Sequence, residues 1–444
     1  MSGRVVSPAS GAGRRYLVRP AASVHGELTV PGDKSISHRA LMLGGIAEGE
    51  TSISGFLASE DCLATLAALG ALGVRIERPA ETQVRVHGVG RDGLAGAARP
   101  LDMGNAGTAI RLLMGLLAGQ RFDSTLIGDA SLMRRPMERV AAPLRAMGAR
   151  IDTESGKPPV RIHGGAALHG IDYALPMASA QVKSALLLAG LYAHGQTRVT
   201  EPAPTRDHTE RMLRGFGVQI GCDGGRVSLT GGQRLRGCEI EVPGDFSSAA
   251  FFIVAGCLAA RQGLTIRNVG INPTRTGLLE MLRLMGADID VQPRRAAAPE
   301  PVADIHVRAA GLRGIRVPEA LVPLAIDEFP VFFIAAAAAA GETVVTGAAE
   351  LRVKESDRLA AMAAGLSALG IACELLPDGL RVQGGPMRGG SIDSHGDHRI
   401  AMAFAIASLH AGAAIEIADV ANVATSFPGF PQLARAAGLA LLED

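Results

Sequence analysis

The segment 31–43, PGDKSISHRALML, combines residue types that suit the binding of a small anion. A Pro-Gly-Asp turn delivers Lys34, Ser35 and Arg39 to the start of an apolar stretch with helical periodicity. The first N–H groups of a helix have no partner within the helix and carry a partial positive charge, so they attract anions. We therefore interpret this segment as part of an active site, with Lys34 as a catalytic candidate and Ser35 as a binding residue.

A second copy of this turn, PGDFSSAAFFIV, occurs at residues 243–254. It has the same Pro-Gly-Asp turn and serine-containing helix start, but it carries no lysine or arginine. The two copies therefore share a predicted backbone structure and differ in chemistry. We expect only the first copy to belong to the active site.

Other cations also stand where helices are predicted to begin. Arg135 lies in RRPMERV, Lys354 and Arg358 lie in RVKESDRL, and Arg399 lies in GDHRIAMA. A single cation of this kind usually lies on a solvated helix face. Their shared position near helix starts instead favours binding of phosphate and carboxylate groups, which arginine holds with two parallel hydrogen bonds.

Two acidic residues, Asp327 in AIDEFP and Glu355 in LRVKESDRL, stand among these cations. Both precede apolar stretches, so each could serve only to cap a helix. A carboxylate held beside several cations is instead a candidate proton-transfer group. The sequence leaves both interpretations open.

The elements that must position these residues recur along the chain. A helix that ends in an apolar residue and Gly, followed by a strand, occurs six times, at intervals of 68 to 84 residues. The six glycines are Gly73, Gly148, Gly217, Gly286, Gly370 and Gly438. Gly in this position is typical of the residue that follows a helix C-terminus. The recurrence indicates six copies of a unit of about 70 residues.

Each unit reads as strand, helix, strand, helix and two further strands, which predicts an α/β fold because parallel strands need helical crossovers. The first helix of each unit begins with polar residues. These are Lys34-Ser35, Asn105 to Thr108, Ser179 to Gln181, Ser247-Ser248, Asp327-Glu328 and Asp397 to Arg399. If the units pack symmetrically, six helix N-termini can face one place and attract a small polyanion.

The composition of the whole chain excludes several classes of function. Its 444 residues suffice for two or three domains, and 44 Lys and Arg against 43 Asp and Glu leave a net charge of +1. We therefore expect no nucleic-acid partner and no membrane partner. The longest apolar runs have ten residues, fewer than the roughly 18 of a membrane span. The five cysteines form no C-x-x-C pair, which favours a reducing, cytoplasmic location.

Two patterns that suggest a cofactor are incomplete. The segment 88–93 matches G-x-G-x-x-G, but no crossover helix is predicted after it, which argues against a dinucleotide site. His395, Asp397 and His398 have the residue types of metal ligands without a matching ligand set. We predict neither a cofactor nor a metal site.

Nine segments, distributed in order from about residue 16 to the C-terminus, resemble those of one enzyme family. They are PGDKSISHRAL, NAGTAIRLLMG, GDASLMRRPMERV, MASAQVKSALLLAG, TRDHTE, IDEFP, LRVKESDRL, GDHRIAMA and ATSFP. Together they resemble the 5-enolpyruvylshikimate-3-phosphate (EPSP) synthases, also called 3-phosphoshikimate 1-carboxyvinyltransferases. The resemblance is specific because it extends over nearly the whole chain.

The resemblance implies a two-domain inside-out α/β barrel built from six βαβαββ units, with three units in pseudo-threefold arrangement in each domain. The chain would cross between the domains near residues 31–34 and 243–247, where the two Pro-Gly-Asp turns lie. One domain would contain residues 1–32 together with 246–444, and the inserted domain would contain residues 33–245.

The resemblance also implies a reaction of the shikimate pathway that leads to the aromatic amino acids and needs no cofactor. The enolpyruvyl group of phosphoenolpyruvate is transferred to the 5-hydroxyl of shikimate 3-phosphate by addition and elimination, with release of phosphate. It implies that Asp327 accepts the hydroxyl proton, that Glu355 protonates the methylene carbon, and that Lys34 and Lys354 neutralise developing charge. The implied shikimate 3-phosphate ligands are Lys34, Ser35, Arg39, Ser179, Ala180, Gln181, Arg206, Asp327 and Lys354. The implied phosphoenolpyruvate ligands are Lys34, Asn105, Gly107, Arg135, Gln181, Arg358 and Arg399.

The sequence departs from the family pattern at three positions. Ala180 replaces a second serine, which removes one expected phosphate hydrogen bond, and Thr425 replaces a lysine on the phosphoenolpyruvate side. Leu112 replaces a proline that is common in the family. Gly107 keeps room for the inhibitor glyphosate, while the substitutions resemble a subgroup that includes tolerant members, so tolerance stays open.

The closest alternative is the sister enzyme that transfers enolpyruvate to UDP-N-acetylglucosamine. That enzyme uses a loop cysteine, which GDASLMRRPM lacks, and it has Lys-Asn where this chain has Lys34-Ser35. A second alternative is a pseudo-symmetric clamp that binds nucleic acid without chemistry, and the near-zero net charge argues against it. We expect a monomer whose partners are its two small-molecule substrates.

Overall fold

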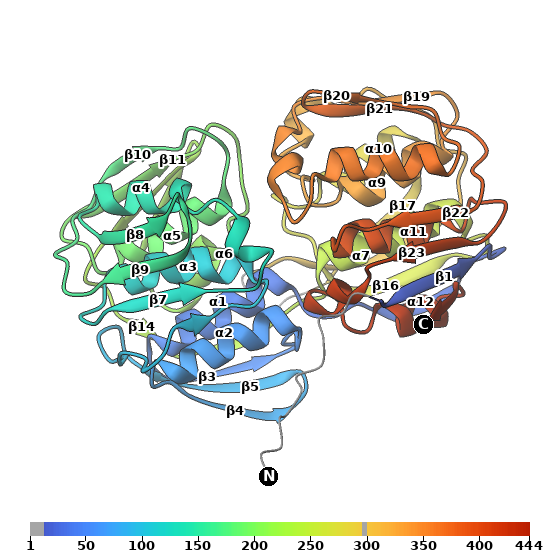
Figure 1. Ribbon diagram of the computed structural model, residues 1–444. Coiled ribbons are helices and arrows are strands. Elements are labelled where there is room, and N and C mark those ends of the chain that lie inside the picture. Colours follow the sequence, from blue (N-terminus) through green and yellow to red (C-terminus); the bar gives the residue numbers. More distant parts are fainter. Residues whose placement is uncertain (1–12, 295–299) are drawn as a thin grey trace, which may run out of the picture.

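The structure is a computed structural model that describes residues 13–294 and 300–444. The chain folds into two lobes (Figure 1). We call the lobe formed by residues 33–242 the inserted half, and the lobe formed by residues 13–31 and the described residues from 245 onward the terminal half. Each half has its own cluster of buried apolar side chains. Residues 1–12, which fall in the predicted terminal domain, lie outside the described residues.

Among the described residues, the strands form six sheets, three in each half. Those of the inserted half are β14 (Leu235–Arg236), β3 (Ala47–Ser54), β5 (Gln83–Val89) and β4 (Arg75–Ala80), with β15 (Glu239–Glu241) also on β3; then β6 (Leu101–Asp102), β7 (Ser124–Ile127), β9 (Lys157–His163) and β8 (Arg150–Glu154); and β10 (Asp172–Ala174), β11 (Gln196–Thr200), β13 (Arg226–Thr230) and β12 (Ile220–Asp223).

Those of the terminal half are β17 (Asp288–Arg294), β18 (Val302–Arg308), β16 (Leu264–Gly270) and β2 (Gly26–Thr29); β19 (Glu342–Val345), β21 (Gly379–Gln383) and β20 (Cys373–Leu376); and β22 (Gly390–Asp393), β23 (Ile415–Ala418), β1 (Arg15–Arg19) and β24 (Ala440–Glu443). Strand β1 lies between β23 and β24, so the start of the described chain completes a sheet formed by its end (Figure 1). A repeated order of one parallel and two antiparallel pairs recurs between the halves, as in β6-β7-β9-β8 and β22-β23-β1-β24.

Helices alternate between fully buried and amphipathic along the chain. The buried ones are α1 (Lys34–Gly45), α3 (Gly107–Ala118), α5 (Ala180–Gly190), α7 (Phe246–Ala259), α9 (Phe329–Ala338) and α11 (His398–Ala407). The amphipathic ones are α2 (Glu60–Ala71), α4 (Glu138–Ala146), α6 (His208–Gly215), α8 (Gly277–Leu284), α10 (Arg358–Ala368) and α12 (Phe430–Ala436). Helices that are apolar on nearly all sides must lie inside, whereas amphipathic ones cover the sheets. Short 3-10 turns are η1 (Leu132–Arg134), η2 (Glu319–Leu321), η3 (Ala349–Val353) and η4 (Ala421–Thr425).

The six repeated glycines end the six amphipathic helices, as the sequence predicts. Each follows the last helical residues and has a left-handed backbone, with φ between 84° and 109°. A residue with a Cβ atom is strained in this conformation, which explains the choice of glycine.

The two Pro-Gly-Asp turns pair with each other where the chain passes between the halves. The Asp33 N–H donates to the Pro243 carbonyl at 2.8 Å, and the Asp245 N–H donates to the Pro31 carbonyl at 2.8 Å. Asp33 caps α1 by accepting from the N–H of Ile36, and Asp245 caps α7 in the same way. The starts of one buried helix from each half therefore lie side by side.

Within the described ranges, no helix has both the length and the apolar character that crossing a membrane requires.

Candidate functional site

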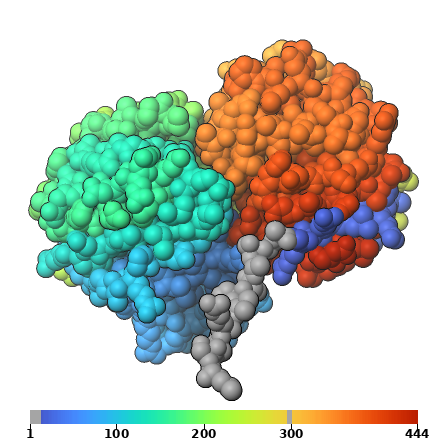
Figure 2. Space-filling model, in the orientation of Figure 1, coloured from blue at the N-terminus to red at the C-terminus, as the bar shows by residue number. Residues whose placement is uncertain are grey.

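The cleft between the two halves has a volume of about 520 Å³ and is lined by residues of both. Figure 2 shows the blue-to-green inserted half beside the orange-to-red terminal half. All six buried helices begin at this cleft. The lining residues at or next to their N-termini are Lys34 and Ser35, Gly107 and Thr108, Ser179 to Gln181, Ser247, Asp327, and His398 with Arg399. The prediction that six helix starts face one place is confirmed.

Most of the predicted site residues lie together in this cleft. Those that line it are Lys34, Ser35, Gly107, Arg135, Ser179, Ala180, Gln181, Arg206, Asp327, Lys354, Glu355, Arg358 and Arg399. Two others, Arg39 and Asn105, do not line it and act through neighbours.

Arg39 lies behind the cleft wall. Its guanidinium is buried and donates to Thr209 Oγ1 at 2.7 Å, to Ser184 Oγ at 2.8 Å and to the Ser35 carbonyl at 3.0 Å. It therefore ties α1, α5 and α6 together and supports the main chain of Ser35.

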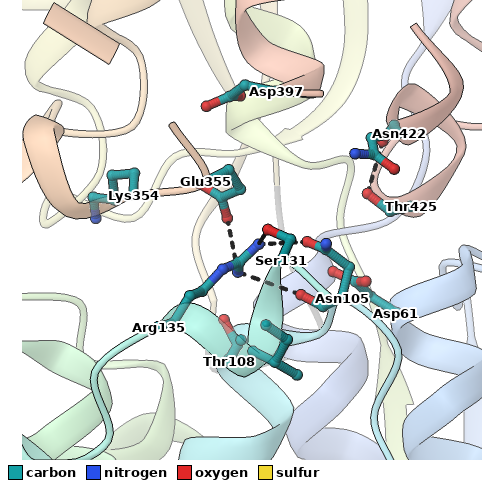
Figure 3. A network of polar contacts seen from close by, with 12 residues as sticks. Asp61, Asn105, Thr108, Ser131, Arg135, Lys354, Glu355, Asp397, Asn422 and Thr425 are labelled. Atoms are coloured by element: carbon teal, nitrogen blue, oxygen red, sulfur yellow. Dashed lines mark hydrogen bonds and ion pairs between the residues drawn. The ribbon is translucent and has the colours of Figure 1, made fainter. Parts of the chain in front are cut away.

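Asn105 reaches the cleft through Arg135. Arg135 Nη2 donates to Asn105 Oδ1 at 2.6 Å, and its Nη1 lies 3.4 Å from Glu355 Oε1 of the terminal half. Figure 3 shows Glu355 and Asn105 on opposite sides of this guanidinium. A methyl group on Gly107 would lie 2.7 Å from Arg135 Nη1, so a larger residue there would force the Arg135 guanidinium to shift.

Asp327 is surrounded by cations. It forms an ion pair with Arg206 of the inserted half, and its Oδ1 lies 3.4 Å from both Lys354 Nζ and Arg358 Nη1. Burial raises the pKa of this carboxyl, but Arg206, Lys354 and the other cations together outweigh it and hold the pKa well below its usual range. Asp327 is therefore ionised in this structure.

Glu355 has a similar environment nearer to Arg135. Its Oε2 accepts from Arg358 Nη2 at 2.6 Å. Burial raises the pKa of Glu355, but Arg358 and Arg135 have the larger combined effect and hold the pKa well below its usual range. Arg358 itself is fixed by Asp397, whose Oδ2 lies 2.8 Å from its Nε.

Neither acid is a helix cap, so that interpretation of the two residues is wrong. The side chain that caps α10 belongs to Asp357, which accepts from the N–H of Ala360 at 3.0 Å. The residue before α9 is Glu328, whose side chain makes no capping hydrogen bond. Both Asp327 and Glu355 are instead engaged by cations in the cleft.

The second Pro-Gly-Asp turn also contributes to the cleft, through Asp245 and Ser247. The expectation that only the first copy belongs to the site is therefore wrong. Pairing of the two turns brings both helix starts to the same place. Arg275 lies between them, with its Nη1 2.5 Å from Asp33 Oδ2 and its Nη2 2.5 Å from Ser247 Oγ.

Several lining residues were missed by sequence reasoning. Lys34 Nζ donates to Asp61 Oδ2 at 2.9 Å, and burial raises the pKa of Asp61 in spite of this lysine. Arg111 Nη1 donates to Gln181 Oε1 at 2.8 Å, and burial lowers the pKa of Arg111 to about 9. Asp61 and Arg111 lie inside ordinary helical patterns, so no local signal marks them.

Thr425 does not line the cleft, although its neighbour Ser426 does. Its side chain is buried and donates to the Asn422 carbonyl at 2.7 Å (Figure 3).

Asp397 is bound to Arg358, and in the described part of the chain no group of three or more His, Cys, Asp and Glu residues is arranged to hold a metal ion.

Comparisons with known proteins agree on one family. The family model described as EPSP synthase (3-phosphoshikimate 1-carboxyvinyltransferase) matches residues 18–433. The 3-phosphoshikimate 1-carboxyvinyltransferase of Methylococcus capsulatus is 63% identical over 425 residues, which cover 96% of this chain and 97% of the relative. That of Alkalilimnicola ehrlichii is 62% identical over 428 residues, 96% of each chain. The solved structure of an EPSP synthase from Acinetobacter baumannii has a TM-score of 0.87 and 54% identity, and the match covers 97% of this chain and 100% of that one.

Proposed function

The chain belongs to the EPSP synthase family, and from this membership we propose that the cleft between its halves is the active site. The enzyme transfers the enolpyruvyl group of phosphoenolpyruvate to the 5-hydroxyl of shikimate 3-phosphate and releases phosphate. One observation carries the assignment of the site: the cleft holds two carboxylates, Asp327 and Glu355, each ion-paired with cations from both halves. Each substrate bears a phosphate and a carboxylate, which such a site can neutralise.

Shikimate 3-phosphate is proposed to bind at the starts of α1 and α5. Ser35, Ser179 and Gln181 offer polar side chains there, and Ala180 offers its main-chain N–H, because the first N–H groups of a helix are unpaired. Arg206, Lys354 and Lys34 supply charge, Asp327 faces the reacting hydroxyl, and Arg39 supports Ser35 from behind.

Phosphoenolpyruvate is proposed to bind between the halves, next to Glu355. The ligands are Lys34, Gly107, Arg135, Gln181, Arg358 and Arg399, with Asn105 orienting Arg135. Arginines suit this substrate because they can pair with phosphate and carboxylate through two parallel hydrogen bonds.

In the addition step, Asp327 removes the proton of the 5-hydroxyl, and the oxygen attacks C2 of phosphoenolpyruvate. Glu355 gives a proton to the methylene carbon, so the double bond becomes a methyl group and a tetrahedral intermediate forms. In the elimination step, the bond from C2 to the phosphate oxygen breaks, and phosphate leaves with the electron pair and takes up the proton that Asp327 removed, which regenerates the base. Glu355 takes one proton back from the methyl group, which restores the double bond.

Glu355 must be protonated before it can act as the acid. Arg135 and Arg358 now hold its pKa low. Phosphoenolpyruvate brings negative charge to the same two arginines, so its binding raises the pKa of Glu355 and favours proton uptake. The substrate thereby prepares its own proton donor.

The finer architecture is also a proposal. We propose two domains, residues 1–32 with 246–444 and residues 33–245, each with three βαβαββ units in an inside-out α/β barrel. The six sheets and the two separate apolar cores support this division. We propose a monomer and a cytoplasmic location, the latter supported by the five free cysteines.

The test is a phosphate-release assay with purified protein and both substrates. Phosphate release that requires phosphoenolpyruvate and shikimate 3-phosphate together is expected. Turnover with UDP-N-acetylglucosamine and none with shikimate 3-phosphate would assign the chain to the sister reaction instead.

A further inference from the structure

The segment Thr205–Thr209 joins the two halves, and its two ends are bound within the inserted half. Thr205 Oγ1 donates to the Glu201 carboxylate. Thr209 Oγ1 lies 2.8 Å from Ser184 Oγ and accepts from Arg39 Nε at 2.7 Å. Both ends of the segment are therefore anchored to its own lobe.

The Glu201 anchor is itself held by a buried lysine. Lys183 Nζ lies 2.8 Å from Glu201 Oε2 and 2.7 Å from Glu210 Oε1, and the Lys183 side chain is only 1% exposed. Lys183 belongs to α5, two residues after Gln181 at the cleft. A buried lysine with two carboxylate partners is a rigid attachment, because breaking either contact leaves an unpaired charge away from water.

The three middle residues contact the terminal half, and Asp207 also forms an ion pair with Arg211 of α6, whose Nε lies 2.8 Å from Asp207 Oδ1. Arg206 pairs with Asp327, and Asp207 Oδ1 accepts from Asn272 Nδ2 at 2.6 Å. His208 Nδ1 lies 2.7 Å from Glu300 Oε1. Because a carboxylate oxygen accepts hydrogen bonds, the Nδ1–H group is the donor. His208, Asn272 and Glu300 are at most 4% exposed.

These partners also hold one another in place. Asn272 Nδ2 donates to Glu300 Oε2 at 2.9 Å, and Asn272 Oδ1 accepts from the Thr274 N–H at 2.9 Å. The orientation of the Asn272 amide is therefore fixed by its own loop. Asp207 and His208 are bound by a single connected group, so the backbone next to Arg206 has little freedom to move.

We propose that Thr205–Thr209 is a strap between the halves, in which Asp207 and His208 are positioning residues that fix Arg206 for binding the phosphate of shikimate 3-phosphate. This inference rests on the proposed function. With its neighbours held, only the Arg206 side chain is free to exchange Asp327 for the substrate. That exchange takes away from Asp327 the cation that lowers its pKa most. It happens when the substrate brings the hydroxyl group that Asp327 is to deprotonate.

The test compares two substitutions of His208 by titration calorimetry with shikimate 3-phosphate. His208→Leu removes the donor to Glu300 and should weaken binding about tenfold or more, because a hydrogen bond to a charged group is lost. His208→Asn keeps a nitrogen donor near the position of Nδ1. The affinity of this variant for shikimate 3-phosphate should stay within about threefold of the wild-type value, because the hydrogen bond to Glu300 is kept with less favourable geometry.

A double-mutant cycle separates positioning of Arg206 from a general loss of stability. In an Arg206→Gln background, His208→Leu should cause no further loss of affinity, because the residue that it positions is absent. An equal loss in both backgrounds, or a lower melting temperature with unchanged affinity, would overturn the strap. If His208→Leu does not fold, Asn272→Ala removes the Asp207 contact, and the same two outcomes apply.

The strap and the proposed function fail in different ways. A wild type that releases phosphate from both substrates, together with a His208→Leu variant of unchanged affinity, removes the strap alone. A wild type that neither binds shikimate 3-phosphate nor turns it over removes both.

Discussion

Arg206 and Asp327 form an ion pair across the cleft, one residue from each half. The guanidinium is a proposed substrate ligand and the carboxylate is a proposed base. In this structure the two groups that would contact the substrate are paired with each other. Substrate binding must therefore replace an existing contact, which links recognition of the phosphate to release of the base.

The first prediction concerns the pH dependence of Arg206→Gln. Burial raises the pKa of Asp327, and Arg206 is the largest of the cationic effects that lower it below its usual range. Removing Arg206 raises this pKa, so the acid limb of kcat/KM for shikimate 3-phosphate, which reports the free enzyme, should move to higher pH. KM for shikimate 3-phosphate should rise about tenfold or more, because the variant loses a charge-assisted hydrogen bond to the substrate.

The same pair makes a contribution to stability with a defined sign. The pKa of Asp327 is lower in the folded than in the unfolded state, so the contribution is present above the unfolded value of about 4. It is lost as the pH falls through the folded-state pKa. Arg198→Gln, a change at an exposed arginine of β11, is the matched control and should leave both the profile and the acid stability unaltered. An unmoved acid limb in Arg206→Gln would show that Asp327 is not the titrating base.

The second prediction separates catalysis from helix capping at two positions that are two residues apart. Glu355→Gln keeps the size of the side chain but cannot donate or accept the proton, so kcat should fall about 10²- to 10⁴-fold. Asp357→Ala removes the side chain that caps α10, and it should lower the free energy of unfolding by about 1 kcal/mol while kcat stays near the wild-type value. Steady-state kinetics and thermal unfolding of both variants check this. A Glu355→Gln enzyme with nearly intact kcat would exclude Glu355 as the proton donor.

The third prediction is proton uptake on binding of phosphoenolpyruvate. Arg358 and Arg135 lower the pKa of Glu355 against the effect of burial, and the anionic substrate neutralises both. Calorimetry of phosphoenolpyruvate binding to the Asp327→Asn enzyme with shikimate 3-phosphate, which cannot proceed efficiently to product, should give a heat that depends on the ionisation enthalpy of the buffer. Adding Glu355→Gln should remove this dependence. A heat that is the same in all buffers would contradict the prediction.

How much of the site is readable from the sequence depends on whether the signal is local. The glycine that ends each amphipathic helix and the polar start of each buried helix are local features, and six repetitions make them recognisable. They predict the convergence of the helix starts because equal units pack alike. The placement of Lys34, Ser35 and Gln181 in one cleft follows from this repetition alone.

The rest depends on contacts between residues far apart in the chain. Asp61 meets Lys34 from the second helix of the same unit, where an acid in the first turn looks like ordinary dipole complementation. Arg275 stands in a loop without a helical pattern, and its role appears only when Asp33 and Ser247 are seen beside it. Pairing of the two Pro-Gly-Asp turns likewise has no signal in either turn alone.

The fourth prediction concerns Gly107→Ala. A Cβ atom there would lie 2.7 Å from Arg135 Nη1 and 3.4 Å from Arg111 Nη1, so the Arg135 guanidinium must shift away from Asn105 and Glu355. Because a misplacement of about 1 Å can cost up to about 100-fold, KM for phosphoenolpyruvate should rise at least about tenfold. Binding of shikimate 3-phosphate should change less than about twofold, since its proposed ligands contact neither arginine except through Gln181. If glyphosate occupies the phosphoenolpyruvate site, the affinity for glyphosate should fall together with the affinity for phosphoenolpyruvate.

The matched control is Gly70→Ala in α2, where the same added methyl group meets no atom within 4 Å. Alanine also favours a helix over glycine by about 1 kcal/mol, so this variant should be at least as stable as the wild type and equally active. Initial rates with each substrate varied in turn at a saturating concentration of the other distinguish the two variants. If Gly107→Ala raises KM for both substrates equally, the methyl group disturbs the cleft as a whole, and Arg135 is not the specific point of contact with phosphoenolpyruvate.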